Sequence, residues 1–249
     1  MKVTVLGCSG TFPGPESGCS SYLVEHEGFR VMLDVGNGAV GALQRHVELF
    51  GVDAVVLSHL HADHCLDLVA YSYARRYAPR DVPTEPLPVY GPPGTPERLL
   101  RCYERWPDHD LATVYSFHDV RPGHLEVGPF SVELAPMAHP VECNAIRLSA
   151  GGRSLTYSGD TGPTESLVRL AQGSDVALFE ASWYEGDDNA PDVHLTGREA
   201  AEHAAKAQVG RLLLTHLTPW GSRERTLEEA DAVFPGDFDV VNDGQTYEI

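Results

Sequence analysis

The sequence predicts a layered α/β protein, and two patterns support this class. Short apolar runs that suit buried strands alternate with stretches that suit helices, from a first strand at Lys2–Leu6 to a last strand near Val240. In addition, reactive side chains repeatedly follow the apolar runs. In layered α/β proteins such strand ends converge on one cleft. The residues in these positions are His59, His139, Asp160, Glu180 and His216.

The N-terminal part of the chain reads as strands joined by glycine-rich turns. Gly7–Thr11 forms a tight loop whose backbone N–H groups could face an anion. Asp34 ends a buried strand, so we expect its carboxylate to bond backbone groups or to orient a metal ligand. The expected elements are strands at Lys2–Leu6, Ser20–Glu25, Phe29–Asp34 and Ala54–Leu57, and a helix at Ala39–Leu49.

Helix-start signals divide the rest of the chain. Thr95 precedes Pro96 as an N-cap precedes a first-turn proline, and Thr196 with Glu199 forms a capping box. The expected helices are Leu66–Tyr77, Thr95 to near Trp106-Pro107, Thr164–Ala171, Thr196–Gln208 and Arg225–Ala232. The expected strands are Leu87–Tyr90, several between Ala112 and Leu134, Ala145–Ser149, Ser154–Tyr157, Asp175–Phe179 and Arg211–Leu214.

Metal-ligand side chains concentrate directly after the strand Ala54–Leu57. His59, His61, Asp63 and His64 fall within six residues, and imidazole with carboxylate but no thiolate suits a zinc site that keeps room for water. His59 and His61 lie on the same side of an extended segment and can reach one metal. Asp63 and His64 lie where a helix should begin and could serve a second metal. Histidine clusters also cap helices or lie on loops, but the later strand-end residues favour a metal site.

Composition limits the other possibilities. The 249 residues suit one domain, residues 1–249, with ordinary globular content. The formal charge of −18, with Lys2 and Lys206 as the lysines, argues against a broad nucleic-acid surface but leaves small anionic substrates open. Five scattered cysteines without a CxxC pair argue against a disulfide framework. Without a signal peptide or a long apolar run, we expect a cytoplasmic protein that does not enter a membrane.

The series of ligands resembles the metallo-β-lactamase superfamily, whose HxHxDH signature corresponds to His59, His61, Asp63 and His64. The resemblance implies an αββα sandwich, in which two mixed sheets pack face to face with helices outside. It also implies two divalent metal ions, with zinc expected and Mn²⁺ or Fe²⁺ compatible with the same donors. The implied ligands are His59, His61 and His139 for the first metal, Asp63, His64 and His216 for the second, and Asp160 as a bridge together with a water or hydroxide.

A narrower resemblance concerns the C-terminal half. The segments around Glu180, His194-Leu195-Thr196 and Thr215-His216 are similar to tRNase Z-like phosphodiesterases, which implies that His194, oriented by Glu180, is catalytic. Bacterial tRNase Z enzymes of the common type carry a long tRNA-gripping arm between the regions of His139 and Asp160. Here these residues are 21 positions apart, and a hairpin fills the interval. Recognition of a nucleic acid is therefore not expected.

The chain is most similar in its motifs to actinobacterial cyclic-nucleotide phosphodiesterases of this fold. The motifs are Leu43–His46, His61–Leu68, Thr215-His216 and Pro219-Trp220. The resemblance implies hydrolysis of a 3′,5′-cyclic nucleotide such as cyclic AMP to the 5′-monophosphate, with Asp63 accepting the proton of the nucleophile and His194 protonating the departing 3′-oxygen. RNA 3′-end processing, lactone or thioester hydrolysis, and binding of a nucleotide or metal without turnover are the alternatives, and a homodimer is compatible with the family.

Overall fold

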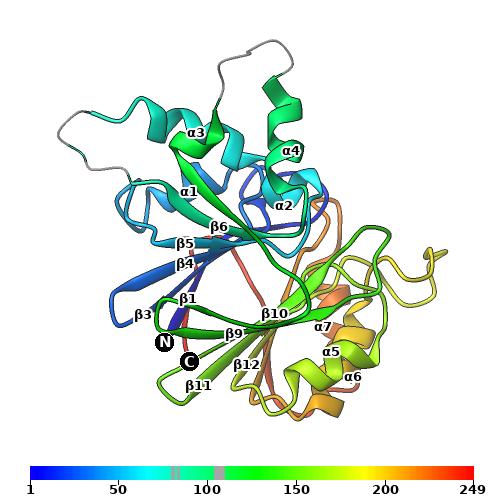
Figure 1. Ribbon diagram of the computed structural model, residues 1–249. Coiled ribbons are helices and arrows are strands. Elements are labelled where there is room, and N and C mark those ends of the chain that lie inside the picture. Colours follow the sequence, from blue (N-terminus) through cyan, green and yellow to red (C-terminus); the bar gives the residue numbers. More distant parts are fainter. Residues whose placement is uncertain (80–81, 83–84, 104–109) are drawn as a thin grey trace.

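Two β-sheets pack face to face, and helices cover the outer face of each sheet (Figure 1). The computed structural model describes residues 1–79, 82, 85–103 and 110–249. The two chain ends lie close together because β15 (Thr246–Glu248) pairs antiparallel with β1 (Lys2–Ser9). This architecture confirms the αββα sandwich expected from the sequence.

The first sheet has the order β15-β1-β3-β4-β5-β6-β7, with β2 beside β1. Its remaining strands are β2 (Gly18–Cys19), β3 (Ser21–His26), β4 (Phe29–Leu33), β5 (Ala54–Val56), β6 (Leu87–Gly91) and β7 (Tyr115–Asp119). The run from β4 to β7 is parallel, so each crossover carries helical segments to the outer face. These are α1 (Ala39–Leu43), α2 (Ala62–Cys65), α3 (Asp67–Arg76), α4 (Thr95–Leu100) and the 3₁₀ turns Arg101–Tyr103 and Leu111–Thr113.

The second sheet has the order β14-β13-β12-β11-β10-β9-β8. Its strands are β8 (Gly123–Val127), β9 (Phe130–Pro136), β10 (Asn144–Ala150), β11 (Arg153–Tyr157), β12 (Val176–Glu180), β13 (Arg211–Thr215) and β14 (Asp237–Val240). The first four strands form an antiparallel meander, and the run from β11 to β14 is parallel. The helices outside this sheet are α5 (Glu165–Ala171), α6 (Gly197–Ala207) and α7 (Arg223–Asp231).

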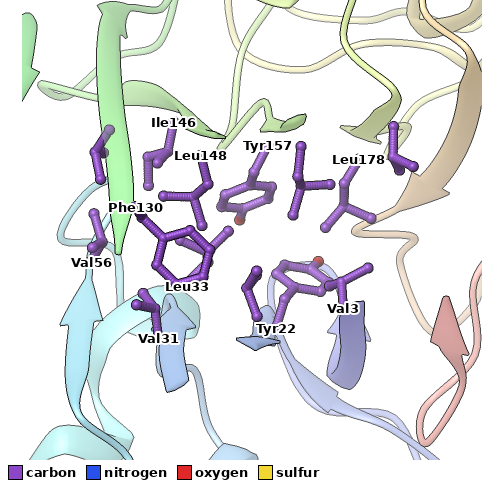
Figure 2. Packing of buried hydrophobic residues seen from close by; sticks show 14 of the residues in the cluster. Val3, Tyr22, Val31, Leu33, Val56, Phe130, Ile146, Leu148, Tyr157 and Leu178 are labelled. Carbon is purple, nitrogen blue, oxygen red and sulfur yellow. The ribbon is translucent and has the colours of Figure 1, made fainter. Parts of the chain in front are cut away.

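The main apolar core lies between the two sheets (Figure 2). Alternate residues of each strand point inward, so that Tyr22 and Leu33 of the first sheet meet Phe130 and Tyr157 of the second. The rings of Tyr22 and Tyr157 lie 5.0 Å apart, and all four side chains are fully or almost fully buried. Replacing Phe130 with Ala in this layer should cost about 3–5 kcal/mol of unfolding free energy. The core therefore holds the two sheets in the fixed relation that the site requires.

Several helix boundaries differ from the sequence expectation. The helix expected over Ala39–Leu49 ends at Leu43, because the next residues form turns that pack the partly buried Val47 against the core and bring the Leu49 carbonyl to the Tyr71 hydroxyl. The N-cap of α4 is Gly94, whose positive φ suits glycine, whereas the Thr95 hydroxyl donates to the Pro92 carbonyl.

Three further points complete the comparison with the expected elements. The predicted end of the helix near Trp106-Pro107 lies outside the described residues. Strand β15 was not expected, because its three residues are too short for a periodicity signal. In the part of the chain that the structure describes, no helix is long and apolar enough to cross a membrane.

Candidate metal centre

The candidate site lies where strand ends of both sheets meet. Asp34 follows β4 and the His59–His64 motif follows β5. In the second sheet, Glu180 is the last residue of β12, and the residues that follow β9, β11 and β13 are His139, Asp160 and His216. Strands β9 and β11 both run antiparallel to β10, and β12 and β13 run parallel to β11, so all four deliver their carboxyl ends to one edge. The expected convergence of the strand-end residues is therefore a consequence of the topology.

Three histidine side chains converge in a first group. His59 Nε2 lies 3.1 Å from His61 Nδ1, and His139 Nε2 lies 3.1 Å from the same His61 atom. His59 is fully buried, while His61 is partly exposed. These are the residues predicted for the first metal.

A second group contains Asp63, His64 and His216. His64 Nε2 lies 3.2 Å from His216 Nε2, and Asp63 Oδ2 lies 3.3 Å from His216 Nε2 and 3.5 Å from His64 Nε2. All three side chains are buried. The residues predicted for the second metal are thus adjacent, although β5 and β13 belong to different sheets.

Asp160 faces both groups with different oxygens. Its Oδ2 lies 3.6 Å from His59 Nε2 and 4.0 Å from His139 Nε2. Its Oδ1 lies 3.3 Å from His64 Nε2 and 3.5 Å from His216 Nε2, yet has no hydrogen-bond partner among the described residues although it is buried. A buried carboxylate oxygen without a donor is costly unless a cation satisfies it. This is the geometry of a bridging ligand.

The donor atoms fit a dinuclear metal centre. Zinc–nitrogen distances of 2.0–2.1 Å and tetrahedral angles place neighbouring ligand atoms roughly 3.3 Å apart. The nitrogen–nitrogen separations of 3.1 to 3.2 Å within each group match this spacing. Neutral imidazole lone pairs that face one another at such distances repel unless a cation or a proton lies between them. The His/Asp cluster is therefore consistent with the two-metal site typical of this fold.

The second ring nitrogens of four ligand histidines are held by hydrogen bonds. His64 Nδ1 donates to Asp34 Oδ2 over 2.7 Å, and His59 Nδ1 contacts Ser58 Oγ, which itself donates to Asp34 Oδ2. The other two contacts are His139 Nδ1 to the Val193 carbonyl at 2.9 Å and His216 Nδ1 to Ser182 Oγ at 2.7 Å. Such contacts fix the tautomer and the ring orientation of a metal ligand.

Sequence reasoning identified only part of this supporting layer. It gave Asp34 two options, bonding backbone groups or orienting a metal ligand, and in the structure Asp34 accepts from His64 Nδ1, from the Ser58 N–H and from the Tyr157 hydroxyl. The parts played by Ser58 and Ser182 were missed. Each stands beside a motif residue, directly before His59 or two positions after Glu180, so the sequence held a weak signal for both.

The ionisation of the ligands suits metal binding. Burial, reinforced by neighbouring imidazoles, lowers the pKa of His59 and of His61, so their lone pairs are free. Burial acts to raise the pKa of Asp63 and of Asp160, but histidine contacts outweigh it and hold both below the ordinary value. Burial also acts to lower the pKa of His64, but Asp160 and Asp34 keep it well above the ordinary value. Metal binding must therefore displace a proton from His64.

Part of the expected glycine-rich loop is strand, because β1 continues through Ser9, and the turn that follows it at Gly10-Thr11 contacts a candidate ligand. The backbone N–H of Thr11 donates to Asp63 Oδ2 over 2.8 Å, so the anion that this loop meets in the structure is a side chain of the same chain. A Cβ on Gly10 would lie 2.5 Å from the carbonyl oxygen of His216. Asp34 and His216 adopt positive φ angles, which are uncommon without glycine and gather at functional sites.

A histidine–glutamate pair lies beside the two groups. His194 Nδ1 donates to Glu180 Oε1 over 2.8 Å, and the fully buried Glu180 also accepts from the Thr161 and Ser182 N–H groups. Burial acts to lower the pKa of His194, but the charge and hydrogen bond of Glu180 outweigh it and raise that pKa to about 9. The His194 ring lies 5.7 Å from the His139 ring and 5.4 Å from the His216 ring. The pair therefore presents a proton donor at the edge of the cluster.

Several polar side chains on the segment that follows the metal motif are buried and hold the fold together. Tyr71 is fully buried and its hydroxyl donates to the Leu49 carbonyl, while Arg75 is buried against the Val114 carbonyl. The Cys65 thiol is also buried and contacts the carbonyl of His61, and burial raises its pKa to about 12. These residues support the helix that follows the metal motif.

Residues 29–217 match the Beta-lactamase superfamily domain, and the chain belongs to the metallo-β-lactamase superfamily. With its His/Asp cluster it is a metal-dependent hydrolase of that fold. The protein ML1173 of Mycobacterium leprae, described as uncharacterized, is 42% identical over 256 aligned positions. The alignment covers 100% of this chain and 89% of that protein. The crystal structure of the metallo-beta-lactamase fold protein YhfI from Bacillus subtilis has a TM-score of 0.88 at 29% identity and covers 99% of this chain and 98% of that chain.

A third relative is the Ribonuclease Z of Methanothermobacter thermautotrophicus. It is 30% identical over 306 aligned positions, which cover 100% of this chain and 97% of that protein. Because this chain has 249 residues, 57 of those positions have no counterpart in it. The ribonuclease therefore carries substantial segments that this chain lacks.

Proposed function

We propose that the protein is a phosphodiesterase that hydrolyses a small phosphodiester, with a 3′,5′-cyclic nucleotide as substrate and the 5′-monophosphate as product. The observation that carries the proposal is the pairing of His194 with the buried Glu180 at the edge of the metal cluster. An alkoxide leaves poorly from phosphorus, so a positioned acid accelerates its departure by about 10²–10⁴-fold. A raised His194 pKa keeps that acid protonated near neutral pH.

The residues that would hold the metals are the two triads joined by Asp160. The donor set suits zinc, and Mn²⁺ or Fe²⁺ fits the same nitrogen and oxygen ligands. When bound, the two ions supply water activated near neutral pH and neutralise charge on the phosphate. Asp63 is held through Oδ2 by the Thr11 N–H, which leaves Oδ1 as the atom that accepts a proton from the attacking water. His194 then donates the proton of Nε2 to the departing 3′-oxygen, while Glu180 holds Nδ1.

Two features favour a small substrate over a polymer. The interval between His139 and Asp160 is filled by the hairpin of β10 and β11, so it contains no extended arm. The chain also carries 36 acidic residues against 18 basic ones, which opposes a long polyanion. A small phosphodiester needs only the local positive charge of the metal centre.

Ribonuclease Z activity is the second candidate, because a ribonuclease Z is 30% identical to the chain. Lactone or thioester hydrolysis at the same metals is a further alternative, in which His194 would have no essential part. The test compares turnover of 3′,5′-cyclic AMP, a precursor tRNA and an acyl-homoserine lactone by zinc-loaded protein, with and without chelator. The proposal expects chelator-sensitive release of 5′-AMP with intact tRNA and lactone. Trimmed tRNA or opened lactone with intact cyclic AMP would overturn it.

A further inference from the structure

A cavity of about 410 Å³ opens directly beside the first metal group. His61 forms part of its wall, so the cavity adjoins the first metal group. Its volume lies within the usual range for small-molecule sites. The other lining residues are Leu60, Pro92, Pro93, Arg98, Val141 and Glu142.

The walls of this cavity are mainly apolar, and two of the segments that form them carry candidate metal ligands. Leu60 stands between His59 and His61, and Val141 stands two positions after His139. Val141 is 40% exposed, so it presents apolar surface to a ligand in this cavity. Any group attached to a phosphate at the first metal has this apolar surface within reach.

Charged groups stand at the rim of the cavity. Arg98 Nε donates to the Leu60 carbonyl over 3.1 Å, which fixes the guanidinium at the edge. In the described part of the chain Arg98 forms no ion pair, so its remaining N–H donors are available to a ligand. Glu142 adds a carboxylate acceptor on the exposed side. Apolar walls with both donors and acceptors at the rim match a flat heterocycle that has ring nitrogens and an exocyclic amino group.

We propose that this cavity binds the purine base of the nucleotide, an inference that rests on the proposed function. Leu60, the two prolines and Val141 cover the faces of the base. Arg98 donates to an acceptor nitrogen such as N7, and Glu142 accepts from an exocyclic amino group. The cavity therefore sets the preference for a nucleotide over other phosphodiesters, while the metal centre performs the hydrolysis.

The test measures binding, so it does not depend on turnover. Zinc-loaded protein is titrated by calorimetry with 5′-AMP and with ribose 5-phosphate, which has the same phosphate and sugar but no base. The wild type should bind 5′-AMP about 10-fold more tightly, because burial of the base against apolar side chains adds to the affinity that the shared phosphate and sugar supply. Val141→Asn and Arg98→Gln should each remove most of that advantage and leave the Kd of ribose 5-phosphate unchanged.

Matched controls separate the cavity from general effects. Leu227→Asn, the control for Val141→Asn, changes another exposed apolar residue, on α7. Arg101→Gln, the control for Arg98→Gln, removes an arginine charge just beyond α4. Neither control should change the ratio of the two Kd values. Equal wild-type affinities for the two ligands would overturn the proposal. So would an equal weakening of both ligands in Val141→Asn, which would indicate a disturbed metal loop.

A different result would indicate that the base binds at another place on the protein. The exposed rings of Phe12 and Trp220 lie 4.7 Å apart on the loops near the second metal group. Loss of the 5′-AMP advantage in Trp220→Ala, with none in Val141→Asn, would overturn the cavity assignment. If cyclic AMP is not hydrolysed but the base advantage depends on Val141, the base site stands and the proposed reaction fails. If cyclic AMP is hydrolysed without any base advantage, the proposed reaction stands and the base site fails.

Discussion

Replacing Glu180 with Gln tests the part that the carboxylate plays beside His194. The pKa of His194 is raised to about 9 against burial, chiefly by the charge of Glu180 and its hydrogen bond, with a further contribution from Asp160. A glutamine keeps an amide oxygen for the Thr161 N–H but loses the charge. Because burial then dominates, the His194 pKa should fall to about 6.5 or lower.

The size of the effect follows from the two protonation curves. At pH 8 the protonated fraction of His194 falls about 30-fold when its pKa drops from about 9 to about 6.5. At pH 5.5 both forms are largely protonated, so the two proteins should differ much less in kcat. Bound metal ions lower the pKa of His194 in the wild type and in Glu180→Gln alike. The pH range in which the two proteins differ therefore moves to lower pH, while the difference between their two pKa values is kept.

The assay is the pH profile of kcat for cyclic AMP, together with the imidazole titration followed by NMR in the metal-free protein. The alkaline limb should move toward acid in Glu180→Gln. Glu185→Gln, which removes an exposed carboxylate paired with Arg198, should leave the profile unchanged. A loss of the same factor at every pH would refute the reasoning, since it would mean that Glu180 supports the fold rather than the protonation of His194.

Three further changes probe the metal centre. Asp34→Asn removes the negative charge beside His64 Nδ1 and replaces one of the two acceptor oxygens with an N–H donor, so it should weaken metal affinity by about 10–100-fold, measured by competition with a chelator. Unchanged affinity would contradict the orienting role. Gly10→Ala places a Cβ 2.5 Å from the His216 carbonyl oxygen, so elemental analysis should find a metal content that falls from two ions toward one. The control Gly41→Ala, which has open space around the added Cβ, should retain both ions. Zinc at 100 times its Kd should raise the unfolding free energy of the metal-free protein by about 2.7 kcal/mol for each site that it fills, seen as a higher Tm. An unchanged Tm would argue against a site formed in the folded state.

Local patterns indicated a layered α/β protein with candidate ligands at strand ends, whereas the αββα sandwich and the assignment of these ligands to two metals followed from the resemblance to the metallo-β-lactamase superfamily. Apolar runs indicate where strands end, and the residues at those ends, such as His139 and His216, must share one edge once the strand directions are known. The early end of α1 was not predicted because the turn after Leu43 is stabilised by a tertiary contact between Leu49 and Tyr71.

The supporting contacts of the site were beyond sequence reasoning for a similar reason. Ser182 is an ordinary serine until the fold brings His216 within 2.7 Å of its hydroxyl. The Val193 carbonyl that holds His139 carries no side-chain signal at all. The cavity beside His61 likewise combines segments near Leu60, Pro92 and Val141 that are distant in sequence. Such features depend on three-dimensional proximity between common residue types.

The most direct test of the proposed mechanism compares His194→Ala on two phosphodiesters that differ in their leaving groups. Cyclic AMP releases an alkoxide and needs the acid, whereas bis(p-nitrophenyl) phosphate releases a stable phenolate and does not. With two metal ions still bound, the variant should lose about 10²–10⁴-fold in kcat for cyclic AMP and little for the aryl ester. Equal losses on both substrates, or full activity on cyclic AMP, would contradict the assignment of His194 as the acid of a phosphodiesterase.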